Sequence, residues 1–308
     1  MPPTRRSLLL AAAALAARPA RAASEDRPVV PLWPAGPPGG GGPAGPLETD
    51  DRGAIRSIAA PSLEVFVPAR PNGAAVLVAA GGGYRRIEVE REARPAARWL
   101  AERGIAAFVL AYRLPREGWQ AGPMAPLQDA QRALRLIRAG TARAGIDPER
   151  VGVLGFSAGG HLMGLAAARS GLRSYAPVDA ADAGSARPAA AALIYPIVTL
   201  EPPYDRSSTR VQLVGRHPGA AASAEWSVET HVGPRCPPVF LAQAKDDPIS
   251  DVANSRIMAE ACRRAGVPVD LHVVASGGHG FGMGHPGTAS ADWPSWYEAW
   301  LRARGFLT

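Results

Sequence analysis

The pentapeptide G-F-S-A-G at residues 155–159 constrains this chain more than any other sequence feature. An apolar run at residues 151–154, typical of a buried strand, precedes it, and residues 162–169 have the pattern of a helix. This strand–turn–helix setting is typical of a nucleophile elbow, a sharp turn that exposes a serine hydroxyl at the top of a sheet. The glycines are needed because a Cβ on either would crowd the strained turn. The pattern predicts that Ser157 is a nucleophile.

A nucleophilic serine needs a base and a carboxylate, which follow it in the order Ser, Asp or Glu, His in chains with this elbow. An apolar strand at residues 237–244 is followed by Asp246 and Asp247, and a later strand at 269–274 is followed by His279 among glycines. We predict His279 as the base and favour Asp247 over Asp246 as the acid. Asp246 has the alternative role of a solvated strand-end charge, and Asp251 that of a helix N-cap.

The remaining catalytic element is a site for the oxyanion of a tetrahedral intermediate. Three glycines at residues 81–83 follow an early apolar strand at residues 74–80, where backbone N–H groups can approach a reacting carbonyl. Gly82 and Gly83, with Ala158 of the elbow, are the predicted donors. His161, in the elbow helix, is predicted to have a structural or supporting role.

Several of these segments together resemble the BD-FAE-like family of α/β-hydrolases, which includes acetylxylan-esterase-like and feruloyl-esterase-like enzymes. They are G-G-G-Y at residues 81–84, Y-R-L-P at 112–115, G-F-S-A-G-G-H at 155–161 and G-G-H-G-F-G at 277–282. The resemblance extends from about residue 30 to the end. It implies that the triad and the oxyanion donors are the residues predicted above, Ser157, Asp247 and His279 with Gly82, Gly83 and Ala158. It also implies that the substrates are short acyl esters of sugars. Ala80 stands where lipases with an H-G-G-G loop carry histidine, which argues against the hormone-sensitive-lipase branch.

Strands and helices alternate along the chain, which predicts a mostly parallel central sheet with helices on both faces. Together with the nucleophile elbow and the family resemblance, this predicts an α/β-hydrolase fold. The expected organisation is a signal peptide at residues 1–22, a Gly/Pro-rich arm at 23–54 and one hydrolase domain at 55–308. A helix expected at residues 126–142 has an apolar face. Its arginines Arg132, Arg135 and Arg138 fit either an anionic partner or a solvated face.

The N-terminus has the features of a twin-arginine export signal: Arg5 and Arg6, an alanine-rich apolar run, and A-R-A before residue 23. The run is too short and too poor in large side chains for a membrane span. Cleavage would remove four arginines and no acidic residue, lowering the net charge from +7 to +3. We expect a periplasmic or secreted protein, with no nucleic-acid partner and no stable membrane anchor.

The leading hypothesis is a carbohydrate-ester hydrolase acting on small or polysaccharide esters. The alternatives are a small-ester carboxylesterase, a dipeptidyl-peptidase-like enzyme, or a non-catalytic binding protein on the same fold. No metal or organic cofactor is expected, because the chain lacks C-x-x-C, H-E-x-x-H and phosphate-loop patterns. Tyr84, Trp119 and Trp226 are candidate substrate-binding residues whose alternative role is ordinary packing, and the segment 196–236 is expected to form a substrate wall or lid.

Two cysteines, Cys236 and Cys262, lie before one predicted strand and near the end of the helix that follows it. Both are expected toward the same edge of the sheet. In an exported protein they could form a disulfide, and the alternative is two independent small buried residues.

Overall fold

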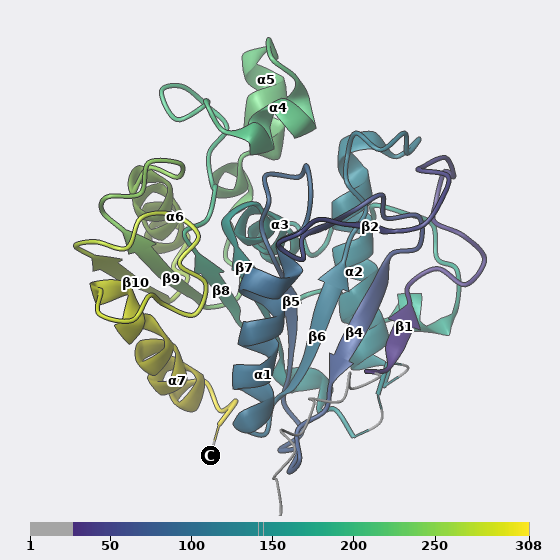
Figure 1. Cartoon of the computed structure of the whole chain (residues 1–308), viewed down its shortest axis with the longest axis horizontal. Coiled ribbons are helices and arrows are strands. Elements are labelled where there is room, and N and C mark those ends of the chain that lie inside the picture. The colour runs from purple at the N-terminus through teal and green to yellow at the C-terminus, as the bar shows by residue number, and fades with distance from the viewer. Residues whose placement is uncertain (1–26, 141, 144, 308) are drawn as a thin grey trace, which may run out of the picture.

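The computed structural model describes residues 27–140, 142–143 and 145–307. Eight strands of this part form the central sheet, in the spatial order β1-β4-β6-β5-β7-β8-β9-β10 (Figure 1). The strands from β6 to β10 pair in parallel, whereas β4 is antiparallel to both β1 and β6. Their bounds are β1 (Val29–Pro31), β4 (Ser62–Phe66), β5 (Ala75–Ala79), β6 (Ala106–Ala111), β7 (Val151–Phe156), β8 (Ala191–Ile194), β9 (Val239–Ala244) and β10 (Val269–Val274).

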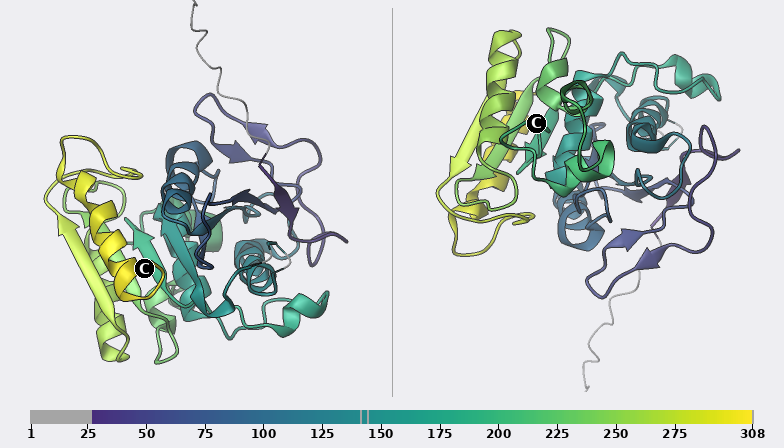
Figure 2. Two further views of the ribbon diagram at one scale, coloured as in Figure 1. Left: turned by 90° about the horizontal axis from the view of Figure 1, so that it is seen from below. Right: turned by 90° about the horizontal axis from the view of Figure 1, so that it is seen from above.

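Helices cover both faces of this sheet (Figures 1 and 2). One face carries α1 (Arg94–Glu102) and α7 (Trp293–Ala303), which meet where Trp99 stacks on Tyr297 at 5.8 Å between ring centroids. The other face carries α2 (Ala125–Arg138), α3 (Ser157–Ala168) and α6 (Ala253–Arg264). The mostly parallel sheet with helices on both faces, as predicted, is confirmed.

Smaller elements lie outside these layers. The short helices α4 (Ser208–Val214) and α5 (Ala220–Trp226) project beyond the sheet at the top of Figure 1. A separate hairpin is formed by β2 (Glu48–Thr49) and β3 (Ile55–Arg56). A π-helical turn, Val89–Ala93, leads into α1.

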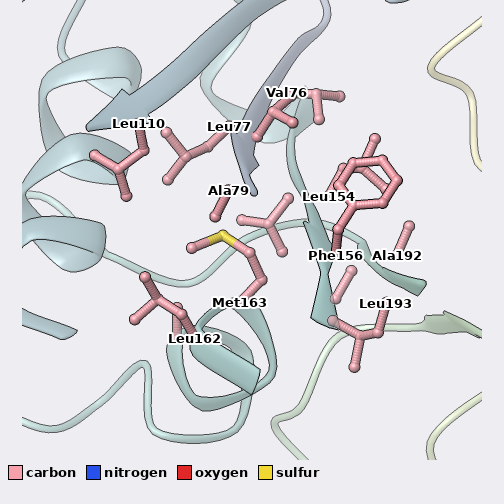
Figure 3. Close-up of a cluster of buried hydrophobic side chains, with 14 of the residues drawn as sticks. Val76, Leu77, Ala79, Leu110, Leu154, Phe156, Leu162, Met163, Ala192 and Leu193 are labelled. Carbon is pink, nitrogen blue, oxygen red and sulfur yellow. The ribbon is translucent and has the colours of Figure 1, made fainter. Parts of the chain in front are cut away.

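The core lies where the central strands meet α3. Every residue of β5, β7, β8 and β9 is buried, because helices exclude water from both faces of these strands. Figure 3 shows Leu162 and Met163 of α3 against side chains of these strands, including Leu154 and Leu193. This packing fixes α3, and therefore the turn at its first residue, against the sheet.

The predicted element boundaries are close to the observed ones. The strand expected at 269–274 is observed with those bounds, and the one expected at 74–80 is one residue shorter at both ends. The helix expected at 126–142 ends earlier, at Arg138. Gly140 adopts a positive φ of 69° two residues later, which turns the chain out of the helix.

Two roles were considered for the arginines of α2, binding of an anionic partner and a place on a solvated helix face. Arg132 has neither role. Its side chain is buried, donates from Nε to the Leu32 carbonyl at 3.0 Å, and pairs with Asp179 and Asp182. Arg135 donates to the Tyr175 hydroxyl at 2.7 Å. The N-terminal arm and the segment around residue 180 cover this side of α2, so these arginines bind the chain's own groups.

The expected arm at 23–54 is only partly irregular. Val29–Pro31 forms the edge strand β1, Trp33 donates from Nε1 to Asp129 at 2.7 Å, and Gly42 donates to the Gly118 carbonyl at 3.1 Å. The predicted signal peptide at 1–22, and residues 23–26 of the arm, lie outside the described residues. Cys236 and Cys262 are both buried and both free.

Candidate active site

Ser157 is the first residue of α3 and directly follows β7, so the strand turns into the helix at the serine. Its φ of 51° is in the left-handed region, the strained conformation expected of a nucleophile elbow. A Cβ on Gly155 would lie 2.3 Å from the Gly159 carbonyl oxygen, and one on Gly159 would lie 2.2 Å from that of Ala79. The steric need for both glycines is therefore as predicted.

The structure brings Ser157, His279 and Asp247 into one hydrogen-bonded chain. Ser157 Oγ lies 2.8 Å from His279 Nε2, and His279 Nδ1 lies 2.7 Å from Asp247 Oδ2. With the ring proton on Nδ1, His279 donates to the carboxylate and its Nε2 accepts from the serine hydroxyl. This is the arrangement in which imidazole removes a proton from serine.

The surroundings of Asp247 fix its carboxylate. Oδ1 accepts from the backbone N–H groups of Ile249 and Ser250, both at 2.8 Å, and Oδ2 also accepts from Gln243 Nε2 at 3.1 Å. The side chain is 0% exposed. Asp247 therefore holds a single orientation toward His279.

Asp246 points to a different partner. Its exposed carboxylate accepts from the backbone N–H groups of Gly278, at 2.9 Å, and Gly277, at 3.4 Å. The hydrogen bond from Gly278 lowers the pKa of Asp246 most, and burial opposes it only in part. The residue anchors the loop that carries His279 rather than contacting the imidazole.

The predicted oxyanion donors surround the serine. Gly82 and Gly83 line the same pocket as Ser157, and Ala158 is the next residue in the first turn of α3. Both glycines have positive φ, 119° and 63°. The N–H of Gly81 is already used, because it donates to Glu92 Oε2 at 2.6 Å.

Glu92 and Tyr195 are site residues that the sequence analysis missed. Glu92 is 4% exposed and lines the pocket, and its Oε1 accepts from the Tyr195 hydroxyl at 3.0 Å. Burial raises the pKa of Glu92 to about 7, against the opposing hydrogen bonds from Gly81 and Tyr195. Glu92 lies within a run of charged residues, E-V-E-R-E, which is typical of a solvated helix face and gives no signal of burial.

Tyr195 links this carboxyl to the histidine loop. Its hydroxyl donates to Glu92 and accepts from the Gly282 N–H at 3.0 Å, and its ring packs edge-on against His279 with 5.0 Å between centroids. Burial raises the pKa of Tyr195 well above its usual value, so the hydroxyl keeps its proton. Glu92 and Tyr195 therefore connect the glycine loop to the loop of the base.

His161 occupies a structural position, as expected. It is fully buried, Nδ1 lies 3.0 Å from the Tyr84 hydroxyl, and Nε2 lies 2.7 Å from the Trp226 carbonyl. Burial lowers the pKa of His161 to about 4, so the ring is neutral near pH 7. A neutral ring can accept from Tyr84 and donate to the carbonyl.

The structure does not bring the three candidate substrate-binding aromatics to the pocket. Tyr84 and Trp226 are buried around His161, and Trp119 is buried beside Gly42, where a Cβ on the glycine would lie 2.3 Å from its ring. Their alternative role, packing, is the one observed. Aromatic residue type alone could not separate these roles.

The pocket above Ser157 has a volume of about 280 Å³. Part of one wall comes from the segment 196–236, through Ile197 and three hydroxyl side chains, Ser207, Ser208 and Thr209. The remaining lining residues are Gly82, Gly83, Arg85, Arg86, Glu88, Arg91, Glu92, Ser157, Ile249, His279 and Gly280. Four residues of the segment 196–236 therefore lie where a substrate wall was expected, and three of them carry hydroxyl groups.

Clusters of metal-binding side chains and helices able to span a membrane are both absent from the described residues. In that part of the chain no group of three or more His, Cys, Asp or Glu side chains could hold a metal ion. Nor does any helix between residues 27 and 307 that the structure describes have the length and hydropathy to cross a membrane.

Comparison with known sequences matches the BD-FAE family model to residues 63–262. An acetylxylan esterase from Xylanibacter ruminicola is 30% identical over 223 residues, which cover 71% of this chain and 43% of that protein. Endo-1,4-beta-xylanase B from Butyrivibrio fibrisolvens is 34% identical over 206 residues, covering 67% of this chain and 32% of that protein. The chain thus spans less than half the length of these relatives.

Solved structures resemble the chain over most of its length. An acetyl ester-xyloside bifunctional hydrolase from Caldicellulosiruptor lactoaceticus has a TM-score of 0.74 and 31% identity, covering 91% of this chain and 97% of that one. Propionate-bound esterase Est2 from Thermogutta terrifontis has a TM-score of 0.68 and 22% identity, covering 86% and 96%. Together with the sheet order and helix layers, this likeness shows the α/β-hydrolase fold.

Proposed function

The chain belongs to the BD-FAE family, and on this basis we propose that it is a serine ester hydrolase that removes short acyl groups, acetyl above all, from carbohydrate such as acetylated xylan. The observation that carries the proposal is the hydrogen-bonded chain of Ser157, His279 and Asp247 beside the glycine loop. The names of the acetylxylan esterase and of the acetyl ester-xyloside hydrolase support a sugar acetate as the substrate.

In the proposed reaction, His279 Nε2 takes the hydroxyl proton of Ser157 while Oγ attacks the ester carbonyl. The oxyanion that forms accepts hydrogen bonds from the N–H groups of Gly82, Gly83 and Ala158. The C–O bond to the alcohol then breaks, and the alcohol leaves with the proton from Nε2. Water repeats these steps on the acyl-enzyme and releases the carboxylic acid and free Ser157.

Asp247 has an electrostatic and orienting role in this reaction. Its carboxylate holds the Nδ1–H tautomer of His279 and stabilises the imidazolium that forms when Nε2 takes the proton. The backbone N–H groups of Ile249 and Ser250 keep the carboxylate in place at each step.

The proposal extends to export. We propose that the chain is cleaved after Ala22 and delivered to the periplasm or outside the cell. Three sequence features support this: Arg5 and Arg6, the apolar run that follows them, and the A-R-A sequence. The mass of the protein recovered from the periplasm or the medium tests this, with Ala23 expected as the first residue. Recovery only from the cytoplasm with the full-length mass would contradict it.

The test of activity is a panel of esters given to the purified protein: acetylated xylan, a feruloyl sugar ester, and 4-nitrophenyl acetate. We expect acetate release from xylan, with Ser157→Ala inactive but folded, because the smaller side chain fits the same turn. Turnover of 4-nitrophenyl acetate without any release from acetylated xylan would favour a general carboxylesterase. Activity on dipeptide amides alone would favour a peptidase.

A further inference from the structure

The pocket beside Ser157 has one basic wall. Arg85 and Arg86, from the loop after β5, and Arg91, from the π-helical turn, all line it. Arg85 and Arg91 are the exposed members of this set that have no acidic partner within the described residues. Hydroxyl-bearing residues of the segment before and within α4 also line the pocket.

The chain's own acidic groups neutralise only one of these three arginines. Arg86 donates from Nε to Glu88 at 2.6 Å. Within the part of the chain that the structure describes, Arg85 and Arg91 make no side-chain hydrogen bond or ion pair. The neighbouring Arg94, by contrast, pairs with both Glu64 and Glu90.

The acidic residues that line the pocket do not balance these two charges. Glu88 is paired with Arg86. Glu92 is buried, binds Gly81 and Tyr195, and has its pKa raised to about 7 by burial, so part of the population carries no charge at neutral pH. The pocket therefore has an excess of positive charge next to the nucleophile.

A guanidinium group recognises a carboxylate through two parallel hydrogen bonds, and it keeps its charge at any pH at which the protein is folded. Building on the ester hydrolysis proposed above, we propose that Arg85 and Arg91 form a subsite for a carboxylate carried by the substrate. The substrate class is then an acidic ester. The carboxylate belongs either to the sugar, as in a uronic acid substituent, or to the acyl group, as in a half-ester of a dicarboxylic acid.

Two pairs of substrates test the subsite and separate the two sources of the carboxylate. The sugar pair is acetylated xylo-oligosaccharide with and without a glucuronic acid substituent. The acyl pair is 4-nitrophenyl hydrogen succinate and 4-nitrophenyl butyrate, whose acyl chains have equal length. For each pair the measured quantity is the ratio of kcat/KM for the acidic to the neutral ester, with Ser157→Ala as the blank for spontaneous hydrolysis.

We expect this ratio to be about tenfold in one of the two pairs, because charge-assisted hydrogen bonds are stronger than neutral ones. Arg85→Gln and Arg91→Gln should each reduce the ratio, and the double variant should bring it close to one. Added salt should also reduce it, since these side chains are exposed. The matched control is Arg98→Gln, which removes an exposed arginine of α1 that does not line this pocket and should keep the wild-type ratio.

A ratio near one in both pairs, or an undiminished ratio in the double variant, would overturn the subsite. Failure of the proposed function is a separate outcome, in which no neutral ester is turned over. Calorimetry then decides the subsite. It uses Ser157→Ala with two ligand pairs: the unacetylated xylo-oligosaccharide with and without glucuronic acid, and 4-nitrophenyl hydrogen succinate against the butyrate. Tighter binding of one acidic ligand that is lost when Arg85 and Arg91 are replaced by Gln supports the proposal, and equal binding within both pairs refutes it.

Discussion

Asp246 and Asp247 are neighbours in the sequence, yet their carboxylates bind different groups. Replacing Asp247 by Asn should place the amide oxygen at the Oδ1 position, where the N–H groups of Ile249 and Ser250 need an acceptor. The amide NH₂ then faces His279 Nδ1 and forces the wrong tautomer. We expect kcat to fall by roughly 10³- to 10⁴-fold for Asp247→Asn.

Asp246→Asn is the matched control for this substitution. Its amide oxygen still accepts from Gly278, so the loop is retained, and we expect a loss of less than about tenfold. Steady-state kinetics on 4-nitrophenyl acetate, with circular dichroism to verify folding, provide the comparison. A milder effect at Asp247 than at Asp246 would contradict the assignment of the acid.

The raised pKa of Glu92 makes a prediction about stability. Its usual value is 4.5 and its folded value is about 7. Between these values the unfolded chain ionises the group while the folded chain keeps the proton, so the contribution of Glu92 to stability falls as pH rises. The fall across this window is on the order of 3 kcal/mol. Glu92→Gln removes this dependence, because the amide does not titrate.

Urea unfolding of the wild type and of Glu92→Gln, at pH 5 and at pH 8, measures this effect. We expect the variant to gain stability relative to the wild type at the higher pH. The packing cost of the substitution is the same at both values and cancels in the comparison. If the wild type and the variant differ in unfolding free energy by the same amount at both pH values, then ionisation of Glu92 does not destabilise the folded protein.

Among single residues, those that take part in the reaction were easier to predict from the sequence than those that support them. Ser157 and His279 lie in short motifs at the ends of apolar strands, where residue type and chain order restrict the choice. Glu92 and Arg132 have no such signal, because their burial depends on segments far away in the sequence. The role of Trp119 stayed open between the cleft and ordinary packing for the same reason: its cover comes from Gly41 and Gly42 of the arm.

Among the elements, the elbow helix and β5 are in contact so close that they leave no space for a Cβ at Gly159. A Cβ on Gly159 would lie 2.2 Å from the Ala79 carbonyl oxygen and 2.5 Å from that of Ala80. Gly159→Ala should therefore push α3 away from β5 and displace Ser157. We expect a loss of stability on the order of 3 kcal/mol and loss of most ester turnover.

The matched control is Gly233→Ala, where a Cβ would meet no atom within 4 Å. Thermal unfolding of both variants provides the measurement, and the control should melt within about 2 °C of the wild type. If Gly159→Ala melts with the control and keeps its activity, the steric argument for the elbow is wrong.

Strands were predictable where apolar side chains are continuous or alternate with polar ones. The strands at 75–79 and 269–274 are runs of this kind between turn residues, and their bounds were predicted to within one residue. The edge strand Val29–Pro31 was not anticipated, because three residues next to a Gly/Pro-rich stretch carry too little pattern. It forms because β4 offers an unpaired edge.

At the scale of the whole molecule, the mostly parallel sheet followed from alternating strands and helices and the α/β-hydrolase fold from the elbow motif, whereas the nature of the pocket could not be predicted. The pocket combines the loop after β5, the π-helical turn, α4 and the loops after β9 and β10. These segments meet only because parallel strands end at one edge of the sheet. Their side chains make its walls polar and basic, and no single segment of sequence contains that information.

This polar lining predicts how activity depends on acyl length. Ile197 and Ile249 are the large apolar residues among the pocket residues that the structure describes. In an apolar tunnel each added methylene would contribute about 0.8 kcal/mol of binding, and activity would rise with chain length. In this pocket of about 280 Å³ a longer chain instead meets hydroxyl and guanidinium groups or extends into solvent. We expect kcat/KM to fall at least about tenfold from 4-nitrophenyl acetate to the octanoate.

Initial rates on the acetate, butyrate and octanoate esters test this expectation, with the rate of Ser157→Ala subtracted for spontaneous hydrolysis. The comparison must use kcat/KM, since the apparent KM of a long-chain ester also reflects its low solubility. A steady fall from acetate onward supports a short acyl site. Activity on the octanoate equal to or greater than that on the acetate would mean that an apolar path exists which this lining does not provide, and the short-acyl proposal would fail.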